Sequence, residues 1–257
     1  MNKIDEKYLQ LTREISVTVG DTDFTRHLKP SAIMGYCQDI AAEHAELLGF
    51  GYNDLLQKNL AWILIRMSFK IYKSPQIGDI LTITTLPENP KTLDVNRGYY
   101  ICNADGELVI AASSKWCALD MKTHKISRLS AVFENYTAFD FVPFEPFEGT
   151  NPKIQAFADY SEKSLCSTFE VQITDLDQNL HMNNARYGDI ILNACGMEML
   201  KENQIVHVDL NFMSQLFVND KYEVYKMQKE NTTFIEARNP DSDVVIFRAV
   251  VKWQKKS

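Results

Sequence analysis

The chain has 257 residues, and its 27 Lys and Arg against 34 Asp and Glu give a formal net charge of −7. This acidic balance disfavours nucleic acid as a partner, because nucleic-acid-binding surfaces are basic. The first ten residues are largely charged or polar, and the longest apolar run, residues 60–65, is too short to cross a bilayer. We therefore expect a soluble, cytoplasmic protein without a signal peptide or a membrane span.

The five cysteines are scattered along the chain without CxxC or Cys/His ligand spacing. They are Cys37, Cys102, Cys117, Cys166 and Cys195. This pattern predicts reduced, mostly buried thiols rather than disulfides or a structural zinc site.

An alternating apolar run at Ile15, Val17 and Val19 predicts a first strand with one buried face. Apolar residues then recur at spacings of three and four between residues 33 and 48, which predicts a long helix that ends at Gly49. Four runs that predict strands follow, at residues 61–73, 79–86, 93–102 and 108–119. Residues 51–59 resemble a short second helix between the long helix and these strands.

A connector at residues 129–162 contains six phenylalanines as well as prolines. A flexible linker would be rich in Gly and Ser and poor in aromatic side chains. We therefore expect this connector to pack along the body of the protein as a strap.

The same order of elements then returns. Residues 165–173 alternate as a strand does, residues 184–200 show helical spacing, and four further runs predict strands. These runs are residues 204–214, 221–228, 232–238 and 244–254. Each set is an α+β unit of one strand, one long helix and an antiparallel meander, in which the helix must lie against the sheet to bury its apolar stripe.

Three blocks of sequence occur twice in the same order, which indicates a duplicated domain. A D-x-D-x-x-x-H block begins at Asp21 and again at Asp175, an offset of 154. Residues 63–79 align with 204–220 at an offset of 141, and residues 109–116 align with 246–253 at an offset of 137. The falling offset places extra residues in the first half between helix and sheet, around residues 51–59. Function should be sought where the two halves have diverged.

The second block, residues 175–184 (DLDQNLHMNN), gathers carboxylates, amides and a histidine in a turn before a helix. A helix N-terminus offers free backbone N–H groups, and a histidine beside a carboxylate or amide can serve as a general base. The alternative interpretation is that Asp and Asn only cap the helix and shape the turn.

Comparison with the first block favours a functional role for the second block, because the first block lacks some of its polar side chains. It keeps Asp21, Asp23 and His27 but has Thr25 where the second has Asn179, and Lys29-Pro30 where the second has Asn183-Asn184. We expect the first copy to be retired from catalysis. Residues unique to the second copy are the better functional candidates.

The string DLDQNLHMNN followed by Ala-Arg-Tyr resembles the signature of acyl-acyl carrier protein (ACP) thioesterases, which are tandem double-hotdog enzymes. The resemblance covers almost the whole chain. It implies an α+β fold in which each half is an antiparallel sheet wrapped around a long central helix. We expect an N-terminal hotdog that binds the acyl chain at residues 1–128, the connector, and a C-terminal hotdog with the catalytic motif at residues 163–257.

The resemblance also implies an activity and the residues that perform it. The activity is hydrolysis of fatty acyl-ACP to free fatty acid, which ends fatty acid synthesis. The implied catalytic residues are Asp177, Asn179 and His181, with Gln215 at a position where the family often has glutamate. Leu216 stands where plant members have cysteine, so a thiolate nucleophile at that position is excluded and attack by water is the simpler scheme.

In the mechanism that we expect, His181 takes a proton from the attacking water and then gives one to the leaving thiolate. Asn179 orients the water or the oxyanion, Asp177 holds the turn or tunes His181, and Gln215 can only position a water. Backbone N–H groups near residues 183–184 would form the oxyanion hole.

No metal and no cofactor are expected. Asp175, Asp177 and His181 could bind a metal ion, but no fourth ligand occurs at helical spacing. The expected partner is an ACP that carries a phosphopantetheine-linked acyl chain, and a homodimer is a further expectation. Because such carriers are acidic, docking would use a basic patch that includes Arg66, Lys70 and Arg186. The alternatives are an acyl-CoA thioesterase and a non-catalytic acyl-binding module.

Overall fold

The computed structural model describes residues 8–133, 141, 144, 147, 149–157 and 163–256. The first half contains β1 (Leu11–Ser16), α1 (Pro30–Leu47), α2 (Tyr52–Gln57), β2 (Leu60–Ile71), β3 (Ile80–Pro87), β4 (Asp94–Cys102), β5 (Leu108–Asp120) and β6 (Lys125–Ser127). The second half contains β7 (Ser164–Glu170), α3 (Arg186–Cys195), α4 (Met197–Glu202), β8 (Asn203–Phe212), β9 (Lys221–Lys229), β10 (Thr232–Arg238) and β11 (Val245–Lys255).

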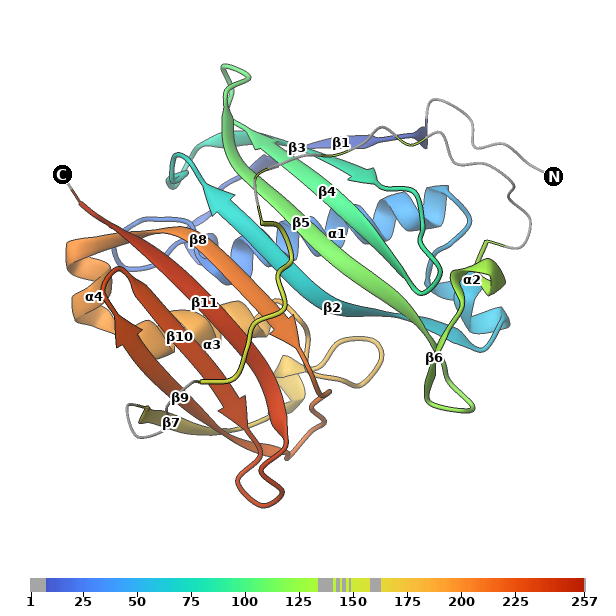
Figure 1. Cartoon of the computed structure of the whole chain (residues 1–257). Helices are drawn as coiled ribbons and strands as arrows, with labels where there is room; N and C mark the ends of the chain where they lie inside the picture. Colours follow the sequence, from blue (N-terminus) through green and yellow to red (C-terminus); the bar gives the residue numbers. More distant parts are fainter. Residues whose placement is uncertain are drawn as a thin grey trace.

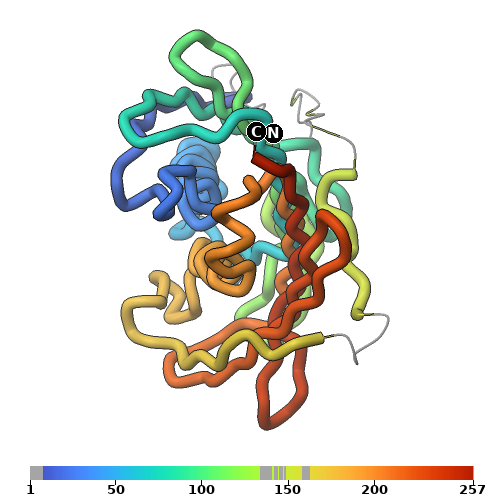
Figure 2. The backbone as a smooth tube through the Cα atoms, turned by 90° about the vertical axis from the view of Figure 1, so that its left-hand side faces the viewer, coloured from blue at the N-terminus to red at the C-terminus, as the bar shows by residue number. Residues whose placement is uncertain are grey.

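The described strands form one antiparallel sheet that runs through both halves. Its order is β1-β3-β4-β5-β2-β8-β11-β10-β9-β7, and β6 pairs with β5. The halves join where β2 pairs with β8, from Arg66 opposite Asn211 to Lys70 opposite His207. The long helices α1 and α3 lie on one face of this sheet (Figures 1 and 2). Each half is therefore a central helix wrapped by a sheet, as predicted.

The periodicity of its apolar residues explains why α1 lies on the sheet. Ile33, Cys37, Ile40, Ala41 and His44 are all buried and share the face of the helix that points to the sheet. Full burial of a large apolar side chain stabilises a fold by about 1.5–3 kcal/mol. The helix gives way to a turn in which Gly49 has a φ of 73°, a conformation that favours glycine.

The helix of the second half differs from its predicted form. In place of one helix over residues 184–200, the structure has α3 and α4 with a break at Gly196, whose φ is 87°. Ala42 holds the equivalent position in α1 at the offset of 154, and there the helix continues. The prediction of an unbroken helix was therefore wrong, because a single glycine inside a helical pattern is compatible with both outcomes.

Helix α2 is the extra segment of the first half, as the falling offset predicted. The Asp54 carboxylate accepts the Gly51 N–H at 3.0 Å at its start, and Leu55 is only 2% exposed. No second-half helix corresponds to α2 in the described ranges, because α4 continues the path of α3 and leads directly into β8. The insertion therefore adds a wall beside α1 in the first half alone.

The connector crosses the face of the sheet opposite the helices, as Figure 2 shows for residues 149–157. The Asn151 N–H donates to the Ser68 Oγ at 2.9 Å, and the Asn151 side-chain amide donates to the Ser113 Oγ at 2.8 Å. The Ile154 N–H donates to the Asn211 side chain at 2.9 Å. The predicted strap is thus confirmed for this part, whereas residues 134–140 and 158–162 of the connector lie outside the described residues.

The two long helices touch near their N-termini. A Cβ atom on Gly188 of α3 would lie 2.4 Å from the Ser31 backbone nitrogen of α1, so only glycine fits there. The Ser31 hydroxyl donates a hydrogen bond to the Asp189 carboxylate. This contact brings the turn that precedes α3 alongside the first-half helix.

Candidate active site

A network of hydrogen bonds holds the second-half turn in one shape. The Asp177 carboxylate accepts the Asn179 N–H at 2.7 Å and the His181 N–H at 3.4 Å. The Asp177 N–H in turn donates to the His181 carbonyl at 2.8 Å. Leu180 lies at the tip with a φ of 61°. Asp177 therefore holds the turn, which is one of the two roles that the sequence indicated.

The first-half turn repeats this network almost bond for bond. Asp23 accepts the Thr25 N–H at 2.7 Å and the His27 N–H at 3.3 Å, and Arg26 has a φ of 69°. The difference lies in one side chain, because the Thr25 hydroxyl also donates to the Asp23 carboxylate at 2.7 Å. The Asn179 side chain makes no such bond within the described residues, so its amide is available to a ligand.

The start of α3 determines which backbone N–H groups can bind an oxyanion. The Asn183 N–H already donates to the Asp175 carbonyl at 2.8 Å, so it is not available. The Asn184 N–H donates to no acceptor in the part of the chain that the structure describes. Of the two backbone N–H groups expected to form an oxyanion hole, only that of Asn184 is therefore available among the described residues. Its first-half equivalent is Pro30, which has no N–H at all.

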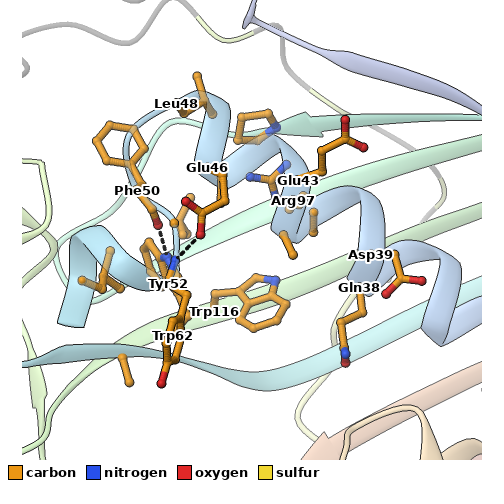
Figure 3. A pocket seen from close by; sticks show the side chains of 18 of the residues that line it. Gln38, Asp39, Glu43, Glu46, Leu48, Phe50, Tyr52, Trp62, Arg97 and Trp116 are labelled. Carbon is orange, nitrogen blue, oxygen red and sulfur yellow. Dashed lines mark hydrogen bonds between the residues drawn. The ribbon is translucent and has the colours of Figure 1, made fainter. Parts of the chain in front are cut away.

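A groove of about 630 Å³ runs beside α1 and reaches the second-half turn. This volume is typical of small-molecule sites, which span about 300–1,000 Å³. Five residues of the second-half turn line it, namely Asp177, Gln178, Asn179, Asn183 and Asn184. Figure 3 shows Gln38 and Asp39 of α1 at one end of the groove, and Leu48 and Phe50 at the other.

The first half supplies the apolar residues that line the groove, together with several charged ones. Its wall includes Leu48, Phe50, Leu55, Ala61, Trp62, Val95, Trp116, Phe133 and Phe141. Trp62 is held by a hydrogen bond from its indole Nε1–H to the Phe50 carbonyl at 2.8 Å. On the α1 side the wall contains the small residues Ala41, Ala42 and Ala45, which leave room between the helix and the tryptophans. The groove thus combines a cluster of apolar first-half side chains with the polar side chains of the second-half turn.

Two of the four predicted site residues do not line this groove. His181 is half-buried, and its ring packs edge-on against Phe217 with 4.8 Å between ring centroids. Gln215 is exposed in the loop between β8 and β9, next to Leu216, whose carbonyl accepts the Met182 N–H at 2.8 Å. The structure therefore brings Asp177 and Asn179 to the groove wall, whereas His181 and Gln215 are not among the residues that line it.

Sequence reasoning missed a buried pair in the first half. The Arg97 guanidinium, on the groove wall, donates to His44 Nδ1 at 2.9 Å, and His44 Nε2–H donates to the Tyr8 carbonyl at 2.8 Å. Burial, reinforced by the positive charge of Arg97, lowers the pKa of His44 to about 4, so the ring is neutral near pH 7. No sequence signal marks this pair, because Arg97 lies on a strand far from α1 in the chain.

His27 of the first-half turn is poorly placed for proton transfer. Its Nδ1 is buried and has no hydrogen-bond partner in the described ranges. Burial lowers its pKa, Lys256 adds to this effect, and Asp23 opposes it. These features fit the expectation of a retired copy.

The residues proposed for a basic patch do not share a surface. The Arg66 guanidinium donates to the Asn151 carbonyl at 3.1 Å, so it lies under the connector. Arg186 begins α3 on the opposite face of the sheet, where it lies 3.5 Å from the carboxylates of both Asp175 and Asp189. The prediction that Arg66 and Arg186 belong to one docking patch was wrong, because the sheet separates them.

Within the described ranges, no group of three or more His, Cys, Asp or Glu side chains is arranged to hold a metal ion. No described helix is long and apolar enough to cross a membrane.

Two helix-and-sheet units joined in one sheet, with a D-x-N-x-H turn beside a groove, define a tandem double-hotdog protein. The chain belongs to the acyl-ACP thioesterase family. The N-terminal domain of that family matches residues 8–137, and its C-terminal domain matches residues 158–255.

Solved structures confirm the double-hotdog fold. An acyl-ACP thioesterase from Bacteroides thetaiotaomicron has a TM-score of 0.86 at 21% identity, over 98% of this chain and 100% of that one. The 12:0-ACP thioesterase from Umbellularia californica has a TM-score of 0.81 at 16% identity, over 96% of this chain and 98% of that one.

Curated relatives come from plants. Oleoyl-acyl carrier protein thioesterase 2, chloroplastic, from Arabidopsis thaliana is 26% identical over 84% of this chain and 60% of its own length. The palmitoyl-acyl carrier protein thioesterase, chloroplastic, from Gossypium hirsutum is 22% identical over 82% of this chain and 53% of its own length. The chain thus spans little more than half the length of these relatives.

Proposed function

We propose that the chain hydrolyses fatty acyl-ACP, releasing the fatty acid and the carrier thiol, and so ends fatty acid synthesis. The observation that carries this proposal is the groove, in which many apolar side chains and the polar turn of the D-x-N-x-H motif line one space. A fatty acyl thioester has the matching form, since it combines a long apolar chain with one polar reacting group at its end. The names of the relatives support the same substrate class.

The acyl chain would lie in the first half. The apolar wall of the groove comes from α1, α2 and the first-half strands, and α2 is the segment that the second half lacks. The N-terminal hotdog, residues 1–128 in our division of the chain, would then bind the chain. The C-terminal hotdog, residues 163–257, would supply the chemistry.

The thioester would lie where the second-half turn meets the groove. The Asn184 N–H is free to bind the developing oxyanion, and the Asn179 amide is free to orient water or substrate. His181 belongs to the same turn and packs against Phe217, and it would give a proton to the leaving pantetheine thiolate. Asp177 holds the turn, and Gln215 can only position a water molecule.

An ACP is the proposed partner, and its pantetheine arm would reach the turn from the side opposite the apolar interior. The cytoplasmic location and the homodimer stay predictions from the sequence. Docking of the acidic carrier would not use Arg66, because the connector covers it.

The test is steady-state hydrolysis of one fatty acyl chain presented on ACP and on CoA in parallel. The proposal expects turnover on both and a clearly higher kcat/KM on the carrier protein. Equal or higher kcat/KM on CoA would identify an acyl-CoA thioesterase. Binding of both without turnover would identify an acyl-binding module and refute the proposed hydrolysis.

A further inference from the structure

Six charged side chains line the groove, and five of them already have a partner. The five are Glu43 (pairs with Arg13), Glu46 (accepts the Tyr52 N–H), Glu88 (accepts the Asn96 amide), Arg97 (donates to His44) and Asp177 (accepts N–H groups of its own turn). The sixth is Asp39 on α1, whose carboxylate has no hydrogen-bond or ion-pair partner among the described residues. Within those residues, Asp39 is the one carboxylate of the groove that is free to meet a ligand.

Asp39 lies on the same groove as the catalytic turn but comes from the other half of the chain. The groove is lined by Asp39 and also by Asn179 and Asn184 of the second half. Figure 3 shows its side chain in the middle of α1, next to Gln38 and away from the apolar residues Leu48 and Phe50. A thioester bound with its acyl chain among the apolar side chains would therefore have its carbonyl near these polar ones.

The duplicated helix provides an internal comparison. At the offset of 154, Gln38 and Asp39 of α1 correspond to Leu192 and Asn193 of α3. Neither Leu192 nor Asn193 can accept a proton near neutral pH. The carboxylate is thus present on the helix that lines the groove of the functional turn and missing from its duplicate.

The surroundings of Asp39 suit a proton acceptor. The side chain keeps contact with solvent through the groove, yet nearby protein removes enough water to raise the pKa of its carboxyl above the usual range. A carboxylate with a raised pKa is the stronger base. The other candidates for this role are weaker. His181, which the sequence suggested as the base, does not line the groove; Gln215 does not titrate; and Asp177 uses one carboxylate oxygen to hold the turn.

We propose, on the basis of the proposed function, that Asp39 is a catalytic residue: its carboxylate takes a proton from the water that attacks the thioester carbonyl. The water oxygen forms a bond to the carbonyl carbon while its proton moves to Asp39, and the oxyanion rests on the Asn184 N–H. The carbon–sulfur bond then breaks, and the thiolate takes a proton from His181. Asp39 loses its proton to solvent and His181 regains one, so the cycle is balanced.

The first test compares Asp39→Asn with wild type on acyl-ACP. Asparagine keeps the shape and cannot take the proton, so kcat should fall by about 10²–10⁴-fold, the usual contribution of general acid–base catalysis, while KM changes little. In wild type the rate should fall as the pH drops through the Asp39 pKa, and Asp39→Asn should lack this acid limb. The matched control is Asn193→Ala, the exposed equivalent on α3, which should keep wild-type kcat.

A second variant separates catalysis from structure. Asp39→Ala leaves space for a small carboxylate, so added formate should raise its kcat and leave wild type unchanged. A folded Asp39→Asn protein with wild-type kcat and an intact acid limb would overturn the assignment. If Asp39→Asn does not fold, the assignment would be overturned by Asp39→Ala whose kcat does not rise with formate. Absence of hydrolysis by wild type would instead refute the proposed function itself.

Discussion

Pro30 in the first half occupies the position that Asn184 occupies in the second, at the end of two turns with the same hydrogen bonds. Lys29 N–H donates to the Asp21 carbonyl at 2.8 Å, just as Asn183 N–H donates to the Asp175 carbonyl at 2.8 Å. The next residue then differs, because asparagine offers a backbone N–H to a ligand and proline has none. The two turns thus differ in whether this residue offers a backbone N–H, in addition to the difference between Thr25 and Asn179.

Asn184→Pro should remove the backbone N–H that the second turn offers to a ligand and that the first turn lacks. Turnover should fall by about 10²–10³-fold, the usual cost of losing one oxyanion donor. The melting temperature should change little, because the first half accommodates proline at this position. The control is Pro30→Asn, which should leave kcat unchanged, and steady-state kinetics with thermal melts checks both. Full activity in a folded Asn184→Pro protein would exclude Asn184 from the oxyanion hole.

The apolar wall of the groove should set chain-length preference. Leu55→Ala enlarges the interior at a residue that is 2% exposed, so kcat/KM for longer chains relative to shorter ones should rise by about tenfold or more. The same change should cost about 2–5 kcal/mol of stability. Leu200→Ala in α4 removes a buried leucine outside the groove wall and should lower stability without changing the preference. Trp62→Phe should act like Leu55→Ala, and an unchanged preference in both would place the chain elsewhere.

No cysteine should be required for turnover. Burial raises the pKa of all five thiols, that of Cys195 to about 12, so none of them is a ready thiolate at neutral pH. Mild alkylation that leaves the circular dichroism spectrum intact should therefore leave kcat intact. Stoichiometric loss of activity traced to one modified cysteine in a folded protein would refute hydrolysis by water alone.

His44 should make stability depend on pH. Its pKa is about 4 in the folded protein against 6.5 in the unfolded chain, so the unfolded chain binds the proton more readily between these values. Stability is therefore fully present above pH 6.5 and is lost as the pH falls toward 4, by up to about 3 kcal/mol. His44→Gln should flatten this part of the profile in urea unfolding measured between pH 7 and pH 4. An equal slope in the variant would mean that other groups, such as His27, carry the dependence.

The sequence was sufficient for features that depend on local pattern and repetition. The duplicated turns, α1 and the inserted α2 followed from periodicity, glycine positions and the falling offset. The candidate role of Asp39 could not be predicted in this way, because a polar residue on an amphipathic helix is normally assigned to the solvent-exposed face. Asn179 and Asn184, which line the same groove, come about 140 residues later in the chain, and only the packing of the halves places all three on one groove.

The sequence also could not predict which side chains of the motif line the groove. The motif pointed to His181, but the packing of its ring against Phe217 depends on the loop between β8 and β9, which the motif does not include. The same holds for Gln215, whose loop leaves it exposed. Spacing along the chain located the turn, whereas tertiary packing decided which of its residues face the groove.

The most direct test of a site confined to the second half is kcat for hydrolysis of one acyl-ACP by His181→Ala and by His27→Ala. The two histidines hold equivalent positions in turns of the same shape, so each substitution is the structural control for the other. The account predicts that His181→Ala loses nearly all turnover while remaining folded, and that His27→Ala keeps most of it. Equal losses at the two positions would contradict it, because they would show that both halves take part in catalysis.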